Sequence, residues 1–170
     1  IDELPPGRRP VITRLFNAGQ KEYIYRAIAE ETKKGRQVYV VYPVIDETEK
    51  TNLKSAIIGK EALEKIFPKL KVDLIHGRLK PQERENIMAS FKKGEIDVLV
   101  STTVIEVGVD VPNAAMMLIV HAERFGLSQL HQLRGRVGRG GSQSYCFLLM
   151  YEPVSEDARR RLDIMVKSSD

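Results

Sequence analysis

The sequence has almost no cysteine and no long hydrophobic run. Cys146 is the only cysteine in 170 residues, so no internal disulfide is possible, and its neighbours Tyr145 and Phe147 indicate a thiol buried in a strand rather than a nucleophile. No apolar run approaches the roughly 20 residues that span a bilayer, and the first residues lack the basic and apolar regions of a signal peptide. We therefore expect a soluble protein of a reducing, intracellular compartment, with no membrane partner.

The motifs with which a single domain hydrolyses a nucleotide are also absent. No Gly-x-x-x-x-Gly-Lys-Ser/Thr phosphate loop occurs, and no Asp-Glu pair ends an apolar strand to hold magnesium. His76, His121 and His131 are scattered and no second cysteine accompanies them, so no metal site is predicted. This domain is not expected to hydrolyse a nucleotide alone.

Short apolar runs alternate with amphipathic stretches over most of the chain. Strands are expected at 38–42, 72–75, 98–100, 116–120 and 145–150, with a further strand at 11–16. Helices are expected at 21–34, 53–67, 82–92, 128–134 and 156–167, with Pro81 before one start and Gly94 after its end. With 42% hydrophobic residues, this pattern predicts one α/β domain with a mostly parallel central sheet and helices on both faces.

Ligand-binding residues of such a sheet are expected beyond the carboxyl ends of its strands. Three polar segments directly follow predicted strands, at 76–78, 101–103 and 123–125. Because the carboxyl ends of parallel strands meet at one edge, we expect these segments to form one surface.

The segment from Ser101 to Pro112 offers hydroxyls and then a glycine beside a carboxylate. Thr102 and Thr103 would suit phosphate oxygens at a strand-to-helix turn, and Asp110 would suit a ribose hydroxyl or a positioned water. A turn in which Thr102 or Thr103 caps its own backbone explains the same residues, and taken alone is the better explanation.

Two further segments each allow two interpretations. Arg78, Lys80 and Arg84 could hold a nucleic-acid backbone, or could be the solvated start of a helix. Tyr42 could stack on a base or pack under the next loop, and packing is the favoured interpretation.

The basic residues are clustered although the net charge is only +4. The clusters are Arg8-Arg9, Lys33 to Arg36, Lys92-Lys93, Arg134 to Arg139 and Arg159 to Arg161. They are compatible with a polyanionic partner, but each taken singly is better explained as a solvated face.

The run from Gln132 to Arg139 is the most informative of these clusters. Arg136 and Arg139 each follow a glycine, and their planar guanidinium groups fit phosphate oxygens bidentately. The leucines before the loop lie at helical spacing and favour an anchored loop over a flexible one. An arginine pair without a phosphate loop is typical of a domain that completes a nucleotide site held by another domain.

In this order, these segments resemble the second RecA-like domain of superfamily 2 helicases and translocases, with its three-layer fold of the P-loop NTPase type. More narrowly, five segments resemble the RecG family of bacterial ATP-dependent helicases, which remodel stalled replication forks and branched DNA. They are Asp2 to Arg8, Val41 to Glu47, Leu74 to Arg78, Ser101 to Asn113 and Glu123 to Gly140. The resemblance covers essentially the whole chain.

The resemblance implies a role for each site residue. Arg136 and Arg139 would reach across an interdomain cleft to the ATP phosphates, and Gln132, Gly108 and Asp110 would line the same cleft. A second set would face DNA: Thr102, Thr103, His76, Gly77, Arg78 and Arg84. ATP and Mg²⁺ would be held mainly by a first RecA-like domain that this chain does not contain.

The resemblance also implies how the chain is organised and where it works. Residues 1–10 would be a linker from an upstream domain, and 11–170 a helicase C-terminal domain that stops before the family's translocation motif and is inactive alone. Its partners would be duplex or branched DNA and the first RecA-like and wedge domains of the same polypeptide. A monomer in the bacterial cytoplasm, associated with the nucleoid, is expected.

Two alternatives stay open, one from the same class of motor proteins and one from another class. Phe125-Gly-Leu and His131 to Arg139 also occur in the translocase domain of transcription-repair coupling factors, whereas the Leu4-Pro-Pro-Gly linker and Val41-Tyr-Pro43 favour RecG. A non-enzymatic nucleic-acid-binding domain, in which the arginines contact only DNA phosphates, would bind DNA with a steep salt dependence and no response to ATP. A scaffold that binds another protein has no positive support.

Overall fold

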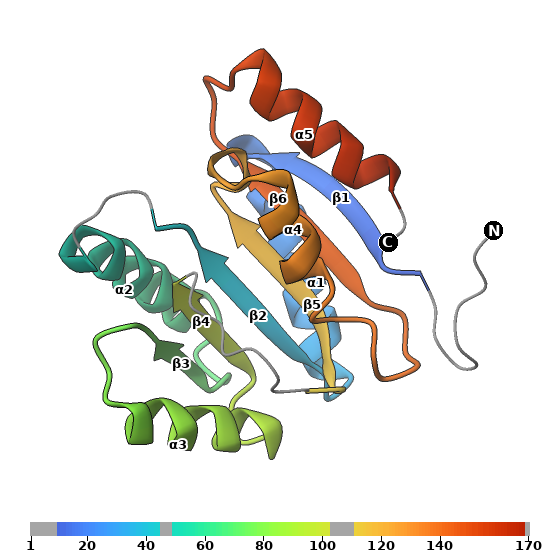
Figure 1. Cartoon of the computed structure of the whole chain (residues 1–170). Coiled ribbons are helices and arrows are strands. Elements are labelled where there is room, and N and C mark those ends of the chain that lie inside the picture. The colour runs from blue at the N-terminus through green and yellow to red at the C-terminus, as the bar shows by residue number, and fades with distance from the viewer. Residues whose placement is uncertain (1–9, 45–48, 103–110, 169–170) are drawn as a thin grey trace.

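The computed structural model describes residues 10–44, 49–102 and 111–168, without the side chains of residues 49–51. Strands and helices alternate along most of the described chain, with β4 followed by β5 (Figure 1). The strands are β1 (Ile12–Asn17), β2 (Gln37–Tyr42), β3 (Val72–Ile75), β4 (Val98–Thr102), β5 (Ala114–Val120) and β6 (Tyr145–Met150). The helices are α1 (Lys21–Lys33), α2 (Glu49–Ile66), α3 (Pro81–Lys92), α4 (Leu127–Arg134) and α5 (Glu156–Lys167), with short 3-10 turns η1 (Ala18–Gln20) and η2 (Ala122–Arg124).

These elements confirm the pattern predicted from the sequence. The largest difference is at the start of α2, which begins at Glu49 rather than 53; β5 begins at Ala114 rather than 116 and β4 ends at Thr102 rather than 100. Pro81 is the first residue of α3, where its missing N–H costs no hydrogen bond. Gly94 follows the end of α3 with a φ of +84°, a left-handed conformation that glycine adopts without strain.

The six described strands form one sheet in the order β1-β6-β5-β2-β4-β3, and every neighbouring pair is parallel. Every residue of β5 is buried. Central strands of a parallel sheet are covered on both faces, which explains why their sequences are continuous apolar runs without alternation. The parallel sheet predicted from the sequence is confirmed.

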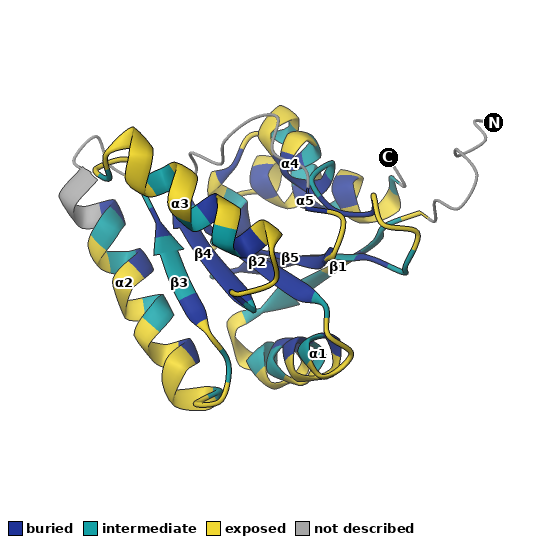
Figure 2. Ribbon diagram, turned by 90° about the horizontal axis from the view of Figure 1, so that it is seen from below, coloured by how far each residue is buried: buried dark blue, intermediate teal, exposed yellow. Residues whose placement is uncertain are grey.

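Helices cover both faces of the sheet in three layers (Figure 2). Val38 and Val40 of β2 pack with Ile24 in the core beneath α1 and α2. Their neighbours Tyr39 and Val41 point to the other face, where α3, α4 and α5 pack and where Tyr39 meets the ring of Phe91 edge-on at 4.9 Å. Successive residues of a strand face opposite sides, so one strand supplies both cores.

Arg134, at the end of α4, is a buried structural residue. It is 1% exposed, and its Nη1 donates hydrogen bonds to Thr13 Oγ1 at 3.1 Å and to the carbonyl oxygens of Met165 and Ser168, both at 2.8 Å. The guanidinium therefore ties α4 to β1 and to the end of α5. The interpretation of Arg134 as part of a solvated basic face is wrong, because the side chain is buried. The sequence did not indicate this, because the hydrogen-bond partners of Arg134 are distant along the chain.

Two other local expectations have clear outcomes. Cys146 is fully buried in β6, as predicted, and burial raises the pKa of its thiol to about 12. Arg161 of the cluster 159–161 is half-buried and donates to the carbonyl oxygens of Phe125 and Glu123 at 3.2 and 3.1 Å. The position of Arg161 is thus also fixed by contacts within the fold.

Candidate functional site

The loop after α4, which carries Arg136 and Arg139, is anchored at both ends. Leu130 and Leu133 of α4 are buried in the core before it. Within the loop, Gly138 has a φ of +87°, and a Cβ atom at that position would lie 2.8 Å from Val11 Cγ2. The left-handed φ favours glycine here, and a larger residue would also have to displace the Val11 side chain.

The arginine loop lies at the amino ends of β1, β5 and β6. Directly after it, the carbonyl oxygen of Ser144 accepts a hydrogen bond from the Ile12 N–H at 2.9 Å, and the Gln143 amide donates to the Pro10 carbonyl at 2.9 Å. The helix α4 starts after the carboxyl end of β5 and leads back to the start of β6. The rule that ligand-binding segments gather at the carboxyl edge therefore does not describe this loop.

Both candidate arginines can meet a ligand that approaches this edge. Arg139 is exposed and Arg136 is half-buried. Arg139 Nε donates to the Gly135 carbonyl oxygen at 3.1 Å, which holds its side chain along the loop. Gln132 is exposed on the last turn of α4, immediately before the loop. Two guanidinium groups on one anchored loop can stabilise negative charge at a fixed position.

The candidate residues Gly108, Asp110 and Thr103 lie outside the described residues. The described chain resumes at Val111, and the next residue, Pro112, touches the arginine loop. A Cβ atom at Gly140 would overlap the Pro112 carbonyl oxygen. The structure thus brings the end of the segment from Ser101 to Pro112 against the loop of Arg136 and Arg139.

The candidate DNA-facing residues lie at the opposite edge of the sheet. His76, Gly77 and Arg78 follow β3, and the backbone N–H of Arg78 donates to His76 Nδ1 at 3.2 Å. Arg84 Nη1 donates to the carbonyl oxygens of Leu79 at 3.0 Å and Gly77 at 3.4 Å. Gly77 and Arg78 are exposed, whereas Arg84 stabilises the loop that presents them.

The three polar segments predicted at this edge do follow adjacent or nearby strands. Their side chains are not equally accessible, however. Ser101 and Thr102 are the last residues of β4 and are 1% and 6% exposed, and Phe125 is also buried. Ser101 Oγ has no hydrogen-bond partner among the described residues. The described part of this edge therefore offers the 76–78 loop and the exposed Arg124 to a partner.

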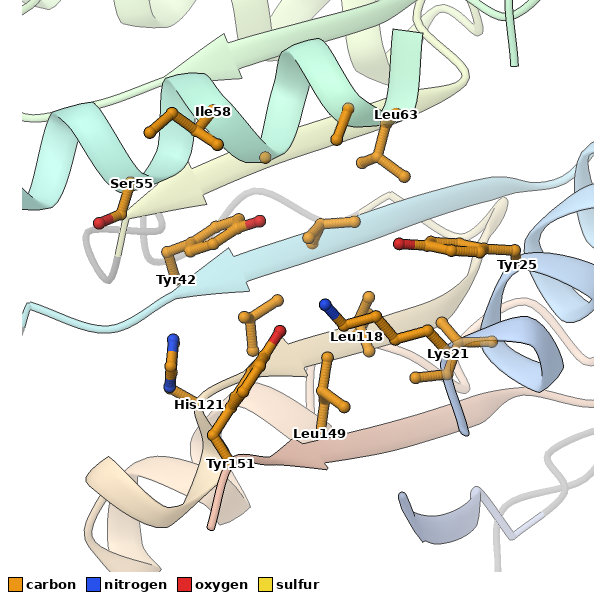
Figure 3. Close-up of a pocket in the computed structure, with 15 residues that line it drawn as sticks. Lys21, Tyr25, Tyr42, Ser55, Ile58, Leu63, Leu118, His121, Leu149 and Tyr151 are labelled. Atoms are coloured by element: carbon orange, nitrogen blue, oxygen red, sulfur yellow. The ribbon is translucent and has the colours of Figure 1, made fainter. Parts of the chain in front are cut away.

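Sequence reasoning did not find a cavity on the α1–α2 face of the sheet. Tyr42 lines it, packed so closely on Gly59 of α2 that a Cβ atom at position 59 would overlap the tyrosine ring (Figure 3). Packing was the favoured interpretation for Tyr42, although its neighbour is a helix rather than a loop. A cavity between helices distant in the sequence leaves no local motif.

Nowhere in 10–44, 49–102 and 111–168 do three His, Cys, Asp or Glu side chains form a group that could hold a metal ion. No helix in the described part of the chain is long and apolar enough to cross a membrane.

Comparison with known protein families decides the class of the domain. The helicase conserved C-terminal domain family matches residues 19–141, which include α4 and both arginines of the loop. The chain belongs to this helicase domain family. The resemblance to superfamily 2 helicases predicted from the sequence is confirmed.

The helicase domain also matches curated relatives over its whole length. It is 54% identical to the ATP-dependent DNA helicase RecG of Synechocystis sp. and 50% identical to that of Escherichia coli, over 171 residues in each case. The chain spans 20% and 25% of the length of these two relatives. The narrower resemblance to RecG is confirmed.

Solved structures agree with this fold. A RecG structure bound to a three-way DNA junction has a TM-score of 0.83 and 46% identity to this chain, and the match covers 99% of this chain and 22% of that one. The Saccharomyces cerevisiae protein Dbp5, bound to RNA and ADP BeF3, has a TM-score of 0.65 at 19% identity, covering 97% of this chain and 42% of that one. The fold of the helicase domain is RecA-like.

Proposed function

We propose that this chain is the second RecA-like motor domain of an ATP-dependent DNA helicase of the RecG kind, which remodels replication forks and Holliday junctions. The observation that carries the proposal is the match of this whole chain to part of RecG, which includes the anchored loop with Arg136 and Arg139. The RecG structure bound to a three-way junction supports branched DNA as the substrate.

The arginine loop would complete a nucleotide site whose phosphate loop lies on another domain. ATP would supply a phosphoryl group whose transfer to water concentrates negative charge on its oxygens. Arg136 and Arg139 suit this charge because a planar guanidinium group fits phosphate oxygens and because both residues sit on a loop fixed by Gly138 and Gly140. Gln132, Gly108 and Asp110 would line the same cleft.

The first RecA-like domain would hold ATP and Mg²⁺. Among the described residues, no three His, Cys, Asp or Glu side chains form a group that could hold a metal ion, and the sequence has no phosphate loop. We therefore propose that this chain contributes the arginine loop and its neighbours to the nucleotide site. The wedge domain of the same polypeptide would engage the junction.

The opposite edge of the domain would contact DNA. Arg78 is exposed beside His76 and Gly77, and Thr102 ends the neighbouring strand β4, with Thr103 next in the sequence. With the arginine loop at one edge and these residues at the other, closing and opening of the interdomain cleft would move the DNA-contacting edge relative to the first domain. Hydrolysis would thus be coupled to translocation along duplex DNA by a monomeric enzyme of the bacterial cytoplasm, associated with the nucleoid.

The test is DNA-stimulated ATP hydrolysis by the full-length helicase with Arg139→Ala, compared with Arg159→Ala on exposed α5 as the control. We expect hydrolysis to fall by roughly 10³-fold or more while ATP and DNA binding are retained, as for other arginine fingers. Unchanged hydrolysis would give Arg139 a structural or DNA-contacting role. ATP-independent DNA binding without any hydrolysis in the wild type would favour a non-enzymatic DNA-binding domain instead.

A further inference from the structure

The cavity on the α1–α2 face has a volume of about 300 Å³. Its floor is the sheet, where Val40, Leu118 and Leu149 from three neighbouring strands are at most 4% exposed. Its walls are the first turns of α1 and the middle of α2 (Figure 3). An apolar floor between two helix walls gives space for the body of a small ligand.

Polar groups converge on this apolar space from α1, from the end of β2 and from the residue that follows β6. The ammonium group of Lys21 and the hydroxyls of Tyr25, Tyr42 and Tyr151 point into the cavity (Figure 3). The Lys21 Nζ lies 5.2 Å from the centre of the Tyr151 ring. A hydrogen bond with the Tyr151 hydroxyl raises the pKa of Lys21, so this side chain remains a cation at neutral pH.

His121, which also lines the cavity, is held in place by its neighbours. Its ring stacks on Tyr151 at 4.1 Å between ring centres, and its Nδ1 lies 3.3 Å from Glu123 Oε2. Glu123 in turn accepts a hydrogen bond from the Tyr151 backbone N–H at 3.0 Å. The polar side of the cavity is therefore built by contacts within the fold before any ligand arrives.

The charge of the lining selects among ligands. Two basic residues, Lys21 and His121, line the cavity, and no acidic residue does so among the described residues. Tyrosine hydroxyls can donate to an acceptor, and a hydrogen bond from an ammonium group to a carboxylate is stronger than one between neutral groups. A compact apolar body with one carboxylate matches both the floor and this polar side.

We propose that this cavity is a binding site for a small aromatic or branched aliphatic carboxylate, whose apolar body lies on Val40, Leu118 and Leu149 and whose carboxylate meets Lys21 and Tyr151. The site is separate from the proposed nucleotide-facing loop. The sheet lies between them, because the loop follows α4 on the other face, and the loop is at the amino edge of the sheet. A ligand here would bind without occupying the proposed nucleotide-facing loop.

Binding is tested by nuclear magnetic resonance titration of the 170-residue chain with 3-phenylpropionate, and with 3-phenylpropionamide as the neutral analogue of the same shape. We expect saturable shifts confined to the cavity residues, with a dissociation constant on the order of 1 mM for a ligand of this size. The amide should bind about tenfold more weakly, because it lacks the charge that Lys21 recognises.

Variants show whether the cavity itself is responsible. Lys21→Met keeps the aliphatic stem and should weaken carboxylate binding about tenfold while leaving amide binding unchanged. Lys33→Met, an exposed lysine at the other end of α1, is the matched control and should bind both compounds like the wild type. Equal effects of the two variants, equal binding of carboxylate and amide, or no saturable shifts by about 10 mM would each overturn the proposal.

The full-length helicase provides the last check. Carboxylate binding retained there, with DNA-stimulated ATP hydrolysis by Lys21→Met equal to the wild type, supports a ligand site distinct from the motor site. Binding to the 170-residue chain but not to the full-length protein would assign the cavity to a contact within the longer polypeptide and overturn a ligand site. Neither outcome depends on Arg139, so failure here is distinguishable from failure of the proposed function.

Discussion

Gly140 and Pro112 lie in backbone contact, so close that a Cβ atom at position 140 would overlap the Pro112 carbonyl oxygen. Gly140 directly follows Arg139, and Pro112 ends the segment that contains the candidate nucleotide residues Gly108 and Asp110. The contact therefore sets the distance between two segments that we propose act on the same nucleotide. Glycine at position 140 is required by this close approach rather than by loop flexibility.

Gly140→Ala is predicted to reduce DNA-stimulated ATP hydrolysis of the full-length helicase at least tenfold. The added methyl group must displace either Pro112 or the arginine loop, and a shift of about 1 Å in a positioning group can cost on the order of 10²-fold in rate. Gly126→Ala is the control, since its Cβ atom would meet its nearest neighbour, Gln129 Oε1, at an ordinary 3.8 Å. Equal hydrolysis rates for the two variants would contradict the prediction, provided that circular dichroism shows both to be folded.

Arg134→Met is predicted to lower the free energy of unfolding by about 3 to 5 kcal/mol, measured by urea denaturation. The substitution removes the donor to Thr13, Met165 and Ser168, and it leaves the buried oxygens of Thr13 and Met165 and the part-buried carbonyl of Ser168 without it. Arg159→Met on α5 is the control, because its ion pair with Asp163 is exposed and should matter by no more than about 0.5 kcal/mol. A loss of less than about 1 kcal/mol for Arg134→Met would show that these hydrogen bonds are not important for stability.

The fold could be predicted from the sequence because its signals are local. Apolar runs such as that of β5 mark buried parallel strands, and Pro81 and Gly94 mark the ends of α3 by their backbone chemistry. The α/β alternation then leaves few possible arrangements of the sheet.

The candidate site could be predicted only in part, because its geometry depends on contacts distant in the sequence. Arg134 and Arg136 stand two residues apart in the same basic run, yet one is buried and the other half-exposed. Thr13, a hydrogen-bond partner that Arg134 has in the buried core, is 121 residues away in the sequence. The contact of Gly140 with Pro112 and the cavity beside Tyr42 likewise arise only when the chain is folded.

The two arginines near the 76–78 loop are predicted to affect DNA binding differently. Arg78 is exposed, so Arg78→Gln should weaken DNA binding by the full-length helicase and lower the slope of log affinity against log salt by about 1. Arg84 instead donates to the Leu79 and Gly77 carbonyl oxygens, so Arg84→Gln should loosen the loop and lower stability as well. The measurements are fluorescence anisotropy at several salt concentrations and urea denaturation. An unchanged salt slope for Arg78→Gln would exclude a phosphate contact by this residue.

Cys146 is predicted to be unreactive in the folded protein. Burial raises the pKa of its thiol from 9.0 to about 12, and the thiolate is the reacting form, so a chromogenic disulfide reagent at about pH 8 should label it only after unfolding in urea. Rapid labelling of the native protein, at a rate independent of urea, would contradict both its burial and its raised pKa.

The same burial predicts that the domain loses stability in alkali. Burial raises the pKa of Tyr42 from 10.0 to about 12, so both Tyr42 and Cys146 favour the protonated form in the folded state. Their contribution to the free energy of unfolding is complete at pH values below the pKa of each group in the unfolded chain. It is lost as pH rises from about 9 to 12 for Cys146 and from about 10 to 12 for Tyr42. Each group adds a slope of at most about 1.4 kcal/mol per pH unit.

Urea denaturation between about pH 8 and 11 should therefore show a falling free energy of unfolding, and Cys146→Ala should reduce the fall that begins near pH 9. An identical pH dependence in this variant would mean that the Cys146 thiol ionises as readily in the folded protein as in the unfolded chain.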